Sequence, residues 1–152
     1  MPIELSAIRD AEEILRLQKL AFRSEAAFYN DFTIPPLIQT LDGMLADIKT
    51  KIVLKLTVDG AIIGSVRGYV KDKTGHIGRL IVHPQFQNHG IGSQLMRAVE
   101  DKLKSAGALR YELFTGDRSE RTIRLYQKLG YHIFSQQPEH DHAVVFMEKP
   151  AG

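Results

Sequence analysis

The sequence predicts a mixed α/β fold in which helices cover both faces of one β-sheet. Its expected strands and helices follow one another in an order that is neither βαβ throughout nor purely antiparallel. The pair Asp59-Gly60 between two apolar runs is typical of a tight hairpin, and an apolar strand at 80–82 leads through a glycine-rich turn into an amphipathic helix. With 152 residues, 43% hydrophobic and 25% charged, the chain is expected to form one domain over residues 1–152.

The N-terminal part is expected to form a strand and two helices. A strand is predicted over residues 3–8, and Asp10 suits the N-cap of a helix whose apolar residues fall near one face: Ile14, Leu15, Leu17, Leu20 and Ala21. Proline is favoured in the first turn of a helix, so Pro35-Pro36 predicts a second, shorter helix that carries Leu37, Ile38, Leu41 and Leu45. Residues 29–33 between the two helices are expected to form a loop.

The middle of the chain is expected to form three strands and one long helix. Strands are predicted over 51–58 and 61–70, joined at Asp59-Gly60, and a turn over 71–75 leads to a third strand over 76–82. The helix from Gly90 to about Ala106 repeats apolar residues at helical spacing: Ile91, Leu95, Ala98, Val99 and Leu103.

The C-terminal part is expected to alternate between strand and helix before a closing hairpin. A strand is predicted over 109–114, and Asp117 with Glu120 three residues later offers a capping box for the next helix. Gly130 suits the left-handed C-terminal cap of that helix. Residues 131–134 and 143–147 then complete the sheet as a hairpin.

The turn before the long helix has the composition of a phosphate-binding loop. A helix N-terminus carries unpaired N–H groups and a partial positive charge, so that the backbone of Gln87–Gly92 can hold an anion such as a pyrophosphate. The dinucleotide fingerprint would need a third glycine where Leu95 stands, and no Gly-Lys-Ser/Thr follows to make a P-loop. The alternative is that the two glycines only shape a tight turn.

Two segments resemble one protein family. The run from Val82 to Phe86, followed by the Q-x-x-G-x-G pattern of Gln87–Gly92, is similar to the acetyl-CoA-binding signature of the GNAT superfamily of N-acetyltransferases. Leu125–Tyr131, a helix that carries a tyrosine and ends at glycine, resembles the downstream motif of that family. The resemblance implies a GNAT-like fold: a central mixed, mostly antiparallel sheet of about six or seven strands with helices on both faces and a splayed cofactor groove.

The same resemblance implies where acetyl-CoA binds as the acetyl donor. The strand residues Leu80, Ile81 and Val82 are expected to pair with its pantetheine arm, and its pyrophosphate is expected on Gln87, Asn88, His89, Gly90, Ile91, Gly92 and Ser93. Ser119 stands where the family often has asparagine, and Thr122 where a small residue is common. Arg121, with Arg124 and Lys128 on one helix face, is a candidate for the 3′-phosphate, although such a stripe is more often solvated surface.

Tyr126 is the expected acid of the reaction. The family motif implies a tyrosine near the thioester sulfur, where a phenol can protonate the departing thiolate. The simpler reading, which is compatible with the first, is a core aromatic three residues from both Ile123 and Leu129.

His76 is the first candidate for the base that deprotonates the amine. It lies four residues before Leu80, so strand alternation predicts both side chains on one face, and several family members have Glu or His at that position. An imidazole suits proton removal near neutral pH, but a solvent-facing turn residue is an equal reading. Glu112 on the neighbouring strand is the second candidate, or only the polar half of an alternating strand.

The acceptor is expected to be a primary amine of a small molecule or peptide, bound near Tyr29, Asp31 and Phe32. Asp31 could attract an ammonium group on which the aromatic rings pack. The chain has no cysteine, so disulfides, thiolate metal sites and a cysteine acyl-enzyme are excluded, and transfer is expected to be direct. The alternative function is a non-catalytic acyl-CoA-binding sensor or regulatory domain of the same fold.

Composition argues against several other partners. A net charge of +2 with dispersed basic residues gives no reason to expect nucleic-acid binding. No apolar run approaches the roughly 20 residues needed to span a bilayer, and residues 1–10 lack an apolar signal core, so a cytoplasmic protein is expected. The segment His140-Asp141-His142 has no third ligand at a usual spacing, so no metal is expected. The expected assembly is a monomer or homodimer.

Overall fold

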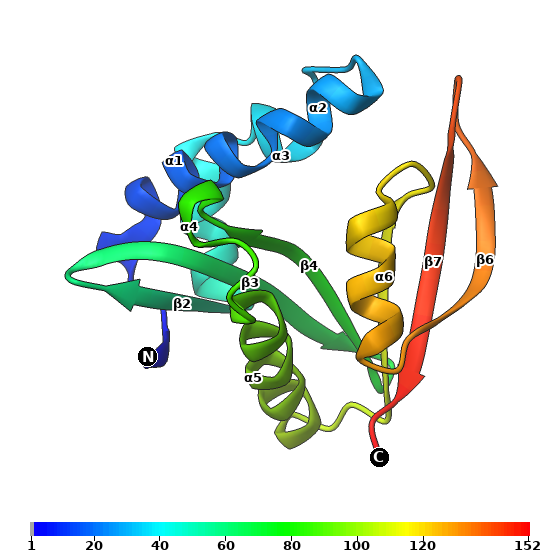
Figure 1. Cartoon of the computed structure of the whole chain (residues 1–152). Coiled ribbons are helices and arrows are strands. Elements are labelled where there is room, and N and C mark those ends of the chain that lie inside the picture. Colours follow the sequence, from blue (N-terminus) through cyan, green and yellow to red (C-terminus); the bar gives the residue numbers. More distant parts are fainter. Residues whose placement is uncertain (1) are drawn as a thin grey trace.

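The computed structural model, which describes residues 2–152, contains one seven-stranded sheet in the order β1-β2-β3-β4-β5-β7-β6 (Figure 1). Only β4 and β5 pair in parallel; the other neighbours are antiparallel. The strands are β1 (Ile3–Leu5), β2 (Ile52–Val58), β3 (Ala61–Lys71), β4 (Thr74–Val82), β5 (Arg110–Gly116), β6 (His132–Pro138) and β7 (Ala143–Pro150). The predicted mixed, mostly antiparallel sheet is therefore confirmed.

Helices cover both faces of the sheet, as predicted. They are α1 (Ala11–Ala21), α2 (Arg23–Tyr29), α3 (Pro35–Ile38), α4 (Leu41–Thr50), α5 (Ile91–Ser105) and α6 (Glu120–Lys128), with two short 3₁₀ turns, η1 (Ile8–Asp10) and η2 (Pro84–Phe86). Helices α1 and α4 pack on one face around Ile14, Met44 and Ile81, whereas α5 and α6 pack on the other (Figure 1). No helix within residues 2–152 is long and apolar enough to cross a membrane.

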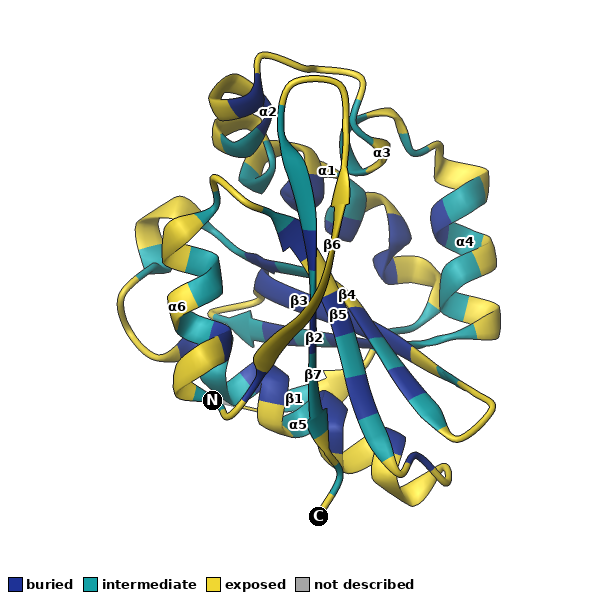
Figure 2. Ribbon diagram, turned by 90° about the vertical axis from the view of Figure 1, so that its right-hand side faces the viewer, coloured by how far each residue is buried: buried dark blue, intermediate teal, exposed yellow. Residues whose placement is uncertain are grey.

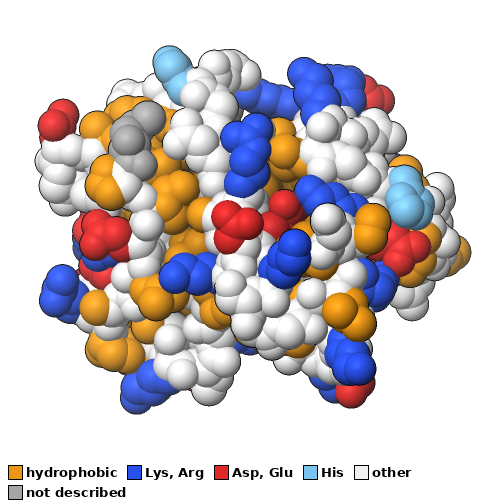
Figure 3. Space-filling view, turned by 90° about the horizontal axis from the view of Figure 1, so that it is seen from below, with side chains coloured by type: hydrophobic (Ala, Val, Ile, Leu, Met, Phe, Trp, Pro, Cys, Tyr) orange, Lys and Arg blue, Asp and Glu red, His pale blue; other side chains and the backbone are white. Residues whose placement is uncertain are grey.

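The helix α5 buries the face that its apolar spacing predicts. Ile91, Leu95, Val99 and Leu103 are at most 2% exposed, and they pack on β2, β3 and β4 in the larger of the two cores (Figure 2). Full burial of such a side chain stabilises the fold by about 1.5–3 kcal/mol. The polar face of α5 lies in solvent, and acidic and basic side chains are interspersed over the surface shown in Figure 3.

The first ten residues differ from prediction in two places. The strand predicted over 3–8 ends at Leu5, because Ile8–Asp10 forms a 3₁₀ turn. The carboxylate of Asp10 does not cap α1; it accepts hydrogen bonds from the Ala7 N–H at 2.7 Å and from Lys55 Nζ at 2.8 Å. A long-range partner on β2 thus replaces the local cap.

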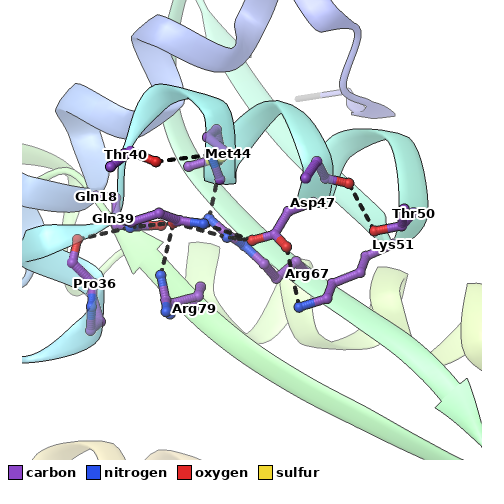
Figure 4. Close-up of polar contacts among 12 residues, drawn as sticks. Gln18, Pro36, Gln39, Thr40, Met44, Asp47, Thr50, Lys51, Arg67 and Arg79 are labelled. Carbon is purple, nitrogen blue, oxygen red and sulfur yellow. Dashed lines mark hydrogen bonds and ion pairs between the residues drawn. The ribbon is translucent and has the colours of Figure 1, made fainter.

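The segment between α1 and β2 contains three helices, where the sequence indicates one. Residues 23–29 form α2, so Tyr29, expected in a loop, ends a helix, and Asn30 follows in the left-handed conformation with φ 52°. The helix predicted from Pro35 is interrupted at Gln39 and Thr40, where the Thr40 hydroxyl accepts from the Gly43 N–H and starts α4. The side chain of Gln39 is thereby directed towards the sheet (Figure 4).

The turns join the strands close to where the sequence places them. Asp59 and Gly60 both have positive φ, 50° and 81°, as a type I′ hairpin turn requires. The next turn is confined to Asp72 and Lys73, so β4 begins two residues earlier than predicted. The last two strands, β6 and β7, are longer than predicted because they pair with each other along nearly their whole length.

A bulge in β4 shapes the site. Gly78 pairs with Arg67 and Ile81 with Ser65, so β4 has one extra residue between these pairs, and Arg79 there has a φ of 51°. The extra residue reverses the alternation, and Leu80 packs in the same core as Ile77. The prediction that His76 and Leu80 share a face is therefore wrong.

The parallel pairing of β4 and β5 is short. It joins only Thr74–His76 to Arg110–Glu112. Beyond these residues the two strands diverge, and the sheet separates into the two arms visible in Figure 1. The splayed groove expected between β4 and β5 is therefore present.

Candidate active site

Two cavities meet beside the point where β4 and β5 separate. The first has a volume of about 520 Å³, and the second, larger one has a volume of about 690 Å³. Both are lined by Phe22, Glu25, Leu80 and Thr122, which define a junction between them. Volumes of this size suit small-molecule ligands, so the groove can receive two reactants that meet at the junction.

The first cavity collects many of the residues predicted to bind the cofactor. It is lined by Leu80, Ile81, Val82, Gln87, Ser119 and Arg121. Arg118 and Arg124 also reach its wall. The predicted cofactor residues Asn88 to Gly90 form the loop that follows Gln87, and Ile91 to Ser93 start α5; none of them lines this cavity. A phosphate-bearing arm that lies in this cavity would end at basic side chains and a helix N-terminus.

The loop before α5 has the backbone of an anion cradle. Gly90 is the N-cap of α5 with φ 76°, a conformation that glycine adopts without strain. A Cβ atom on Gly92 would lie 3.3 Å from Leu125 Cδ2, so this glycine lets α6 approach the start of α5. The first turn of α5 has no acidic residue that would repel an anion.

Side chains around the cradle reinforce this geometry. His89 Nδ1 lies 2.7 Å from the carbonyl oxygen of Gln87 in the same loop, so the imidazole faces the backbone rather than the groove. Arg121 on α6 reaches across and donates to Gln87 Oε1 at 3.3 Å and to Asn88 Oδ1. The guanidinium therefore lies beside the cradle, bound only to neutral acceptors, where an anion can meet it.

Tyr126 lies in the wall of the larger cavity. It is 7% exposed, packs in the core with its ring centroid 5.9 Å from that of Tyr131, and lines the larger cavity. Burial raises the pKa of the Tyr126 phenol well above its ordinary value, and the nearby Glu25 raises it further. The phenol therefore keeps its proton at neutral pH and can donate it. The core-aromatic reading of the sequence is confirmed, and the role of Tyr126 as the acid stays a prediction.

His76 and Glu112 line the same cavity. They are paired across the short parallel ladder, and His76 Nδ1 lies 3.9 Å from Glu112 Oε2. The imidazole stacks on Tyr69 with a centroid distance of 4.9 Å, and Glu112 Oε1 accepts from Arg110 at 3.0 Å. His76 is thus neither isolated nor simply solvent-facing, and the two predicted bases lie side by side.

Glu25 is a site residue that the sequence did not indicate. It extends from α2 to the junction, where its Oε1 accepts from the Ser119 hydroxyl at 3.0 Å. Burial raises the pKa of Glu25, although the Ser119 hydrogen bond opposes this. The helix that carries Glu25 has no clear apolar period, so no local signal placed this carboxylate near Tyr126.

The three residues predicted at the acceptor side lie in different settings. Tyr29 is buried, and its hydroxyl lies 2.9 Å from Ser119 Oγ and accepts from the Arg118 N–H at 3.0 Å, which ties α2 to the β5–α6 loop. Asp31 lines the larger cavity, but its Oδ1 accepts from the Thr33 N–H and hydroxyl, and these bonds lower its pKa. Phe32 is 56% exposed and does not line the cavity.

The model of the acetyltransferase (GNAT) family matches residues 11–131 of the chain. A curated acetyltransferase of Pectobacterium atrosepticum is 35% identical over 74 residues, which are 49% of this chain and 52% of that protein. One of Photorhabdus laumondii is 28% identical over 92 residues, which are 60% of this chain and 61% of that protein. The chain thus matches little more than half the length of these curated relatives.

Solved structures share the whole fold. The PaiA N-acetyltransferase of Thermoplasma acidophilum, determined in complex with coenzyme A, superposes with a TM-score of 0.82 at 18% identity and covers 99% of both chains. A putative acetyltransferase of Salmonella typhimurium with acetyl-CoA gives 0.81 at 19% identity, over 100% of this chain and 94% of that one. At these identities the likeness concerns the fold, and it agrees with the family match over most of the sequence: the chain belongs to the acetyltransferase (GNAT) family.

Proposed function

We propose that this protein is an N-acetyltransferase that moves the acetyl group of acetyl-CoA directly to a primary amine of a small molecule or peptide. The observation that carries the proposal is that Tyr126, a protonated phenol on the wall of the larger cavity, lies near Glu25, a half-buried carboxylate at the junction of the two cavities. One cavity has the phosphate cradle at its end, and the other is open to an acceptor. A cytoplasmic location and a monomeric or homodimeric state remain predictions.

The residues of the first cavity fit acetyl-CoA, which is the donor for this family. The N-terminus of α5 and Arg121 would hold the pyrophosphate, because unpaired N–H groups and a guanidinium are typical phosphate ligands. The β4 backbone from Leu80 to Val82 borders the cavity and would hold the pantetheine arm. Ser119 is already bonded to Tyr29 and Glu25, so we do not assign it a contact with the amide groups of the pantetheine arm.

The reaction requires a proton acceptor, an acetyl donor and a proton donor. Acetyl-CoA supplies the acetyl group as a thioester, in which the C–S bond breaks as the new C–N bond forms. A base of this chain removes the amine proton, and Tyr126 gives its proton to the departing sulfur. The tyrosinate then recovers a proton from solvent or from the protonated base. No covalent acyl-enzyme is needed.

Three groups are candidates for the base. His76 and Glu112 lie together at the end of the cavity where β4 and β5 are paired, and Glu25 lies at the junction. Glu25 is favoured by its position, because it is close enough to Tyr126 for its negative charge to raise the pKa of the phenol. His76 and Glu112 can act through a water. On the acceptor side, we retain Asp31 for the approaching ammonium and assign Phe32 only a rim position.

The first test is the Tyr126→Phe variant. We expect kcat to fall by about 10²–10⁴-fold, the usual contribution of a general acid, with the dissociation constant for acetyl-CoA unchanged. Turnover is followed by thiol release, which this cysteine-free chain does not contaminate, and affinity by calorimetry. An unchanged kcat would remove Tyr126 from the chemistry.

The base is identified by pH–rate profiles of three variants: Glu25→Gln, His76→Gln and Glu112→Gln. The variant that lacks the base loses the acidic limb of the kcat/KM profile, whereas a variant that lacks only a positioning group keeps it. Asp31→Ala is tested in the same assay. If the KM for the acceptor were unchanged in this variant, the role of Asp31 would be withdrawn.

The alternative is a domain that binds acyl-CoA as a sensor or regulatory module without turnover. The cradle and the first cavity would be the same in both functions. A protein that binds acetyl-CoA tightly but releases no thiol with any amine, and in which Tyr126→Phe changes nothing, would support the alternative. The charged lining of the larger cavity favours the enzyme, because a sensor has no need of a second ligand site.

A further inference from the structure

A buried polar network forms one end of the larger cavity (Figure 4). Arg67 on β3 is 4% exposed and donates to Asp47 Oδ2 on α4 and to Gln18 Oε1 on α1, both at 2.5 Å. Gln39, between α3 and α4, donates to Asp47 at 2.8 Å and accepts from Gln18 at 2.9 Å. These bonds attach two helices, α1 and α4, and the turn between α3 and α4 to the sheet.

Arg79 joins this network without an acid of its own. Its Nη1 donates to Gln39 Oε1 at 2.9 Å, the same oxygen that accepts from Gln18 and, at 3.3 Å, from Arg67. Within residues 2–152, no carboxylate oxygen lies within 4.0 Å of the Arg79 guanidinium. A guanidinium has five N–H donors, so most of those on Arg79 are available to a ligand.

The charges at this end of the cavity do not balance. Asp47 is shared by Arg67 and by Lys51, which lies 3.3 Å from Oδ1, so three cations face one anion when Arg79 is included. Burial lowers the pKa of Arg67 to about 10, and the positive charge of Arg79 contributes. The Nε of Arg67 is also buried without a hydrogen-bond partner. An anion bound beside Arg79 would offset the excess of positive charge.

The backbone directs Arg79 to this position. It is the extra residue of the β4 bulge, with φ 51°, in a region where non-glycine residues are uncommon. The bulge turns its side chain away from the α5 core and towards Gln39, on the cavity side of the sheet. Glu25, Asp31 and Glu139 line other parts of the same cavity. The cavity therefore combines a basic end with acidic groups elsewhere on its wall.

We propose that Arg79, supported by Gln39 and Arg67, binds a carboxylate of the acceptor, so that the acceptor is an amino acid or a short peptide rather than a simple amine or polyamine. This inference rests on the proposed function and specifies its acceptor class. A carboxylate matches the paired N–H groups of a guanidinium, and its single negative charge offsets the unpaired Arg79. A phosphate dianion would bring a second negative charge that the one unpaired guanidinium does not offset, and it is therefore disfavoured.

The test compares acceptors that differ only at the carboxylate. The standard amino acids and a set of dipeptides are each assayed with acetyl-CoA beside their C-terminal carboxamides, and phosphoethanolamine serves as the phosphate-bearing amine. We expect the best acceptor to carry a free carboxylate. The kcat/KM of its carboxamide should be about 10–100-fold lower, because a charge-assisted hydrogen bond is lost. Equal rates for acid and amide, or a preference for polyamines or for phosphoethanolamine, would overturn the inference.

Two variants assign the effect to Arg79. Arg79→Gln is expected to reduce kcat/KM about 10–100-fold for the carboxylate acceptor but by less than about threefold for its amide, mainly through KM. Arg16→Gln, at an exposed residue of α1 paired only with Glu12, is the matched control and should behave as wild type. If Arg79→Gln reduced both acceptors equally, Arg79 would have only a structural role.

A binding measurement separates this inference from the proposed function. Protein labelled with ¹⁵N-arginine and saturated with CoA is titrated with N-acetylated amino acids and their amides, and the Nε–H signal absent from Arg79→Gln is followed. A shift with the acids alone supports the inference even without turnover. Failure to bind CoA contradicts the proposed function. CoA binding without any response to the acids, or with equal response to the amides, contradicts only the carboxylate site.

Discussion

The two cavities of the groove are built in different ways. The proposed cofactor side depends mainly on main-chain groups of two short segments, Leu80–Val82 and Gln87–Gly92; in the second, Gly90 has a positive φ and Gly92 lets α6 approach. The acceptor side depends on side chains from α1, α2, α4, β3 and β4 that are distant in sequence; Gln18 and Arg67, for example, are 49 residues apart. A main-chain site is specified locally, whereas a side-chain site exists only after the helices have packed on the sheet.

This difference predicts how each side fails. Binding of the cofactor should be weakened when a side chain is added at a glycine whose backbone approaches the ligand or has a positive φ. The packing around the acceptor cavity should be destabilised when one residue of the buried network is removed. The partners of that residue are then left charged and without hydrogen bonds. The following four variants test this contrast, from the largest expected effect to the smallest.

Asp47→Ala should have the largest effect, on stability. It leaves Arg67, 4% exposed, without its ion pair, and loss of one partner of a buried pair costs about 3–5 kcal/mol. Urea unfolding followed by circular dichroism measures the change. Asp101→Ala, at an exposed position on α5, is the control and should stay within about 0.5 kcal/mol of wild type. Equal stability of the two variants would show that Arg67 does not need Asp47.

Gly90→Val should weaken acetyl-CoA binding by about 10–100-fold, because a β-branched residue does not tolerate the φ of 76° and would deform the cradle. Calorimetry gives the affinity. Gly60→Val introduces the same strain at φ 81° in the β2–β3 turn, away from the cradle, and should leave the affinity unchanged. Wild-type affinity in Gly90→Val would mean that the cradle does not bind the cofactor.

Arg121→Gln should have a smaller effect, about three- to fivefold on the acetyl-CoA dissociation constant, since exposed charges contribute little in water. The affinity of the variant should also depend less on salt than that of wild type, because one charge contact is screened in the wild type alone. Titrations at low and high salt measure both quantities. A larger salt dependence in the variant would exclude a phosphate contact for Arg121.

Glu25→Gln should produce the smallest change, a gain in stability that depends on pH. Burial raises the folded-state pKa of Glu25, so its contribution to stability is complete below the unfolded pKa and is lost as pH rises through the folded pKa. The variant should therefore melt above wild type at about pH 8 and not at about pH 4. The opposite sign would show that the Ser119 hydrogen bond outweighs burial.

Much of the fold was predictable because its signals are local. The hairpin at Asp59-Gly60, the apolar period of α5 and the glycine-rich turn at Gln87–Gly92 each depend on neighbouring residues, and all three are present. The bulge at Arg79 and the helix α2 were not predicted. The bulge follows from the register between β3 and β4, and α2 is stabilised by contacts such as the Tyr29 hydroxyl with Ser119, 90 residues away.

The candidate site also has features that local sequence predicts and features that depend on tertiary contacts. Sequence alone determined the family motifs, the mixed sheet and the burial of Tyr126, because hydrophobic period, glycine positions and motif order are properties of contiguous residues. Tertiary structure alone decided that Glu25 meets Ser119 at the junction and that Arg79 points to Gln39 without an acid. The physical reason is that charge pairing and burial depend on distances between elements, and the chain fixes those distances only when the helices pack on the sheet.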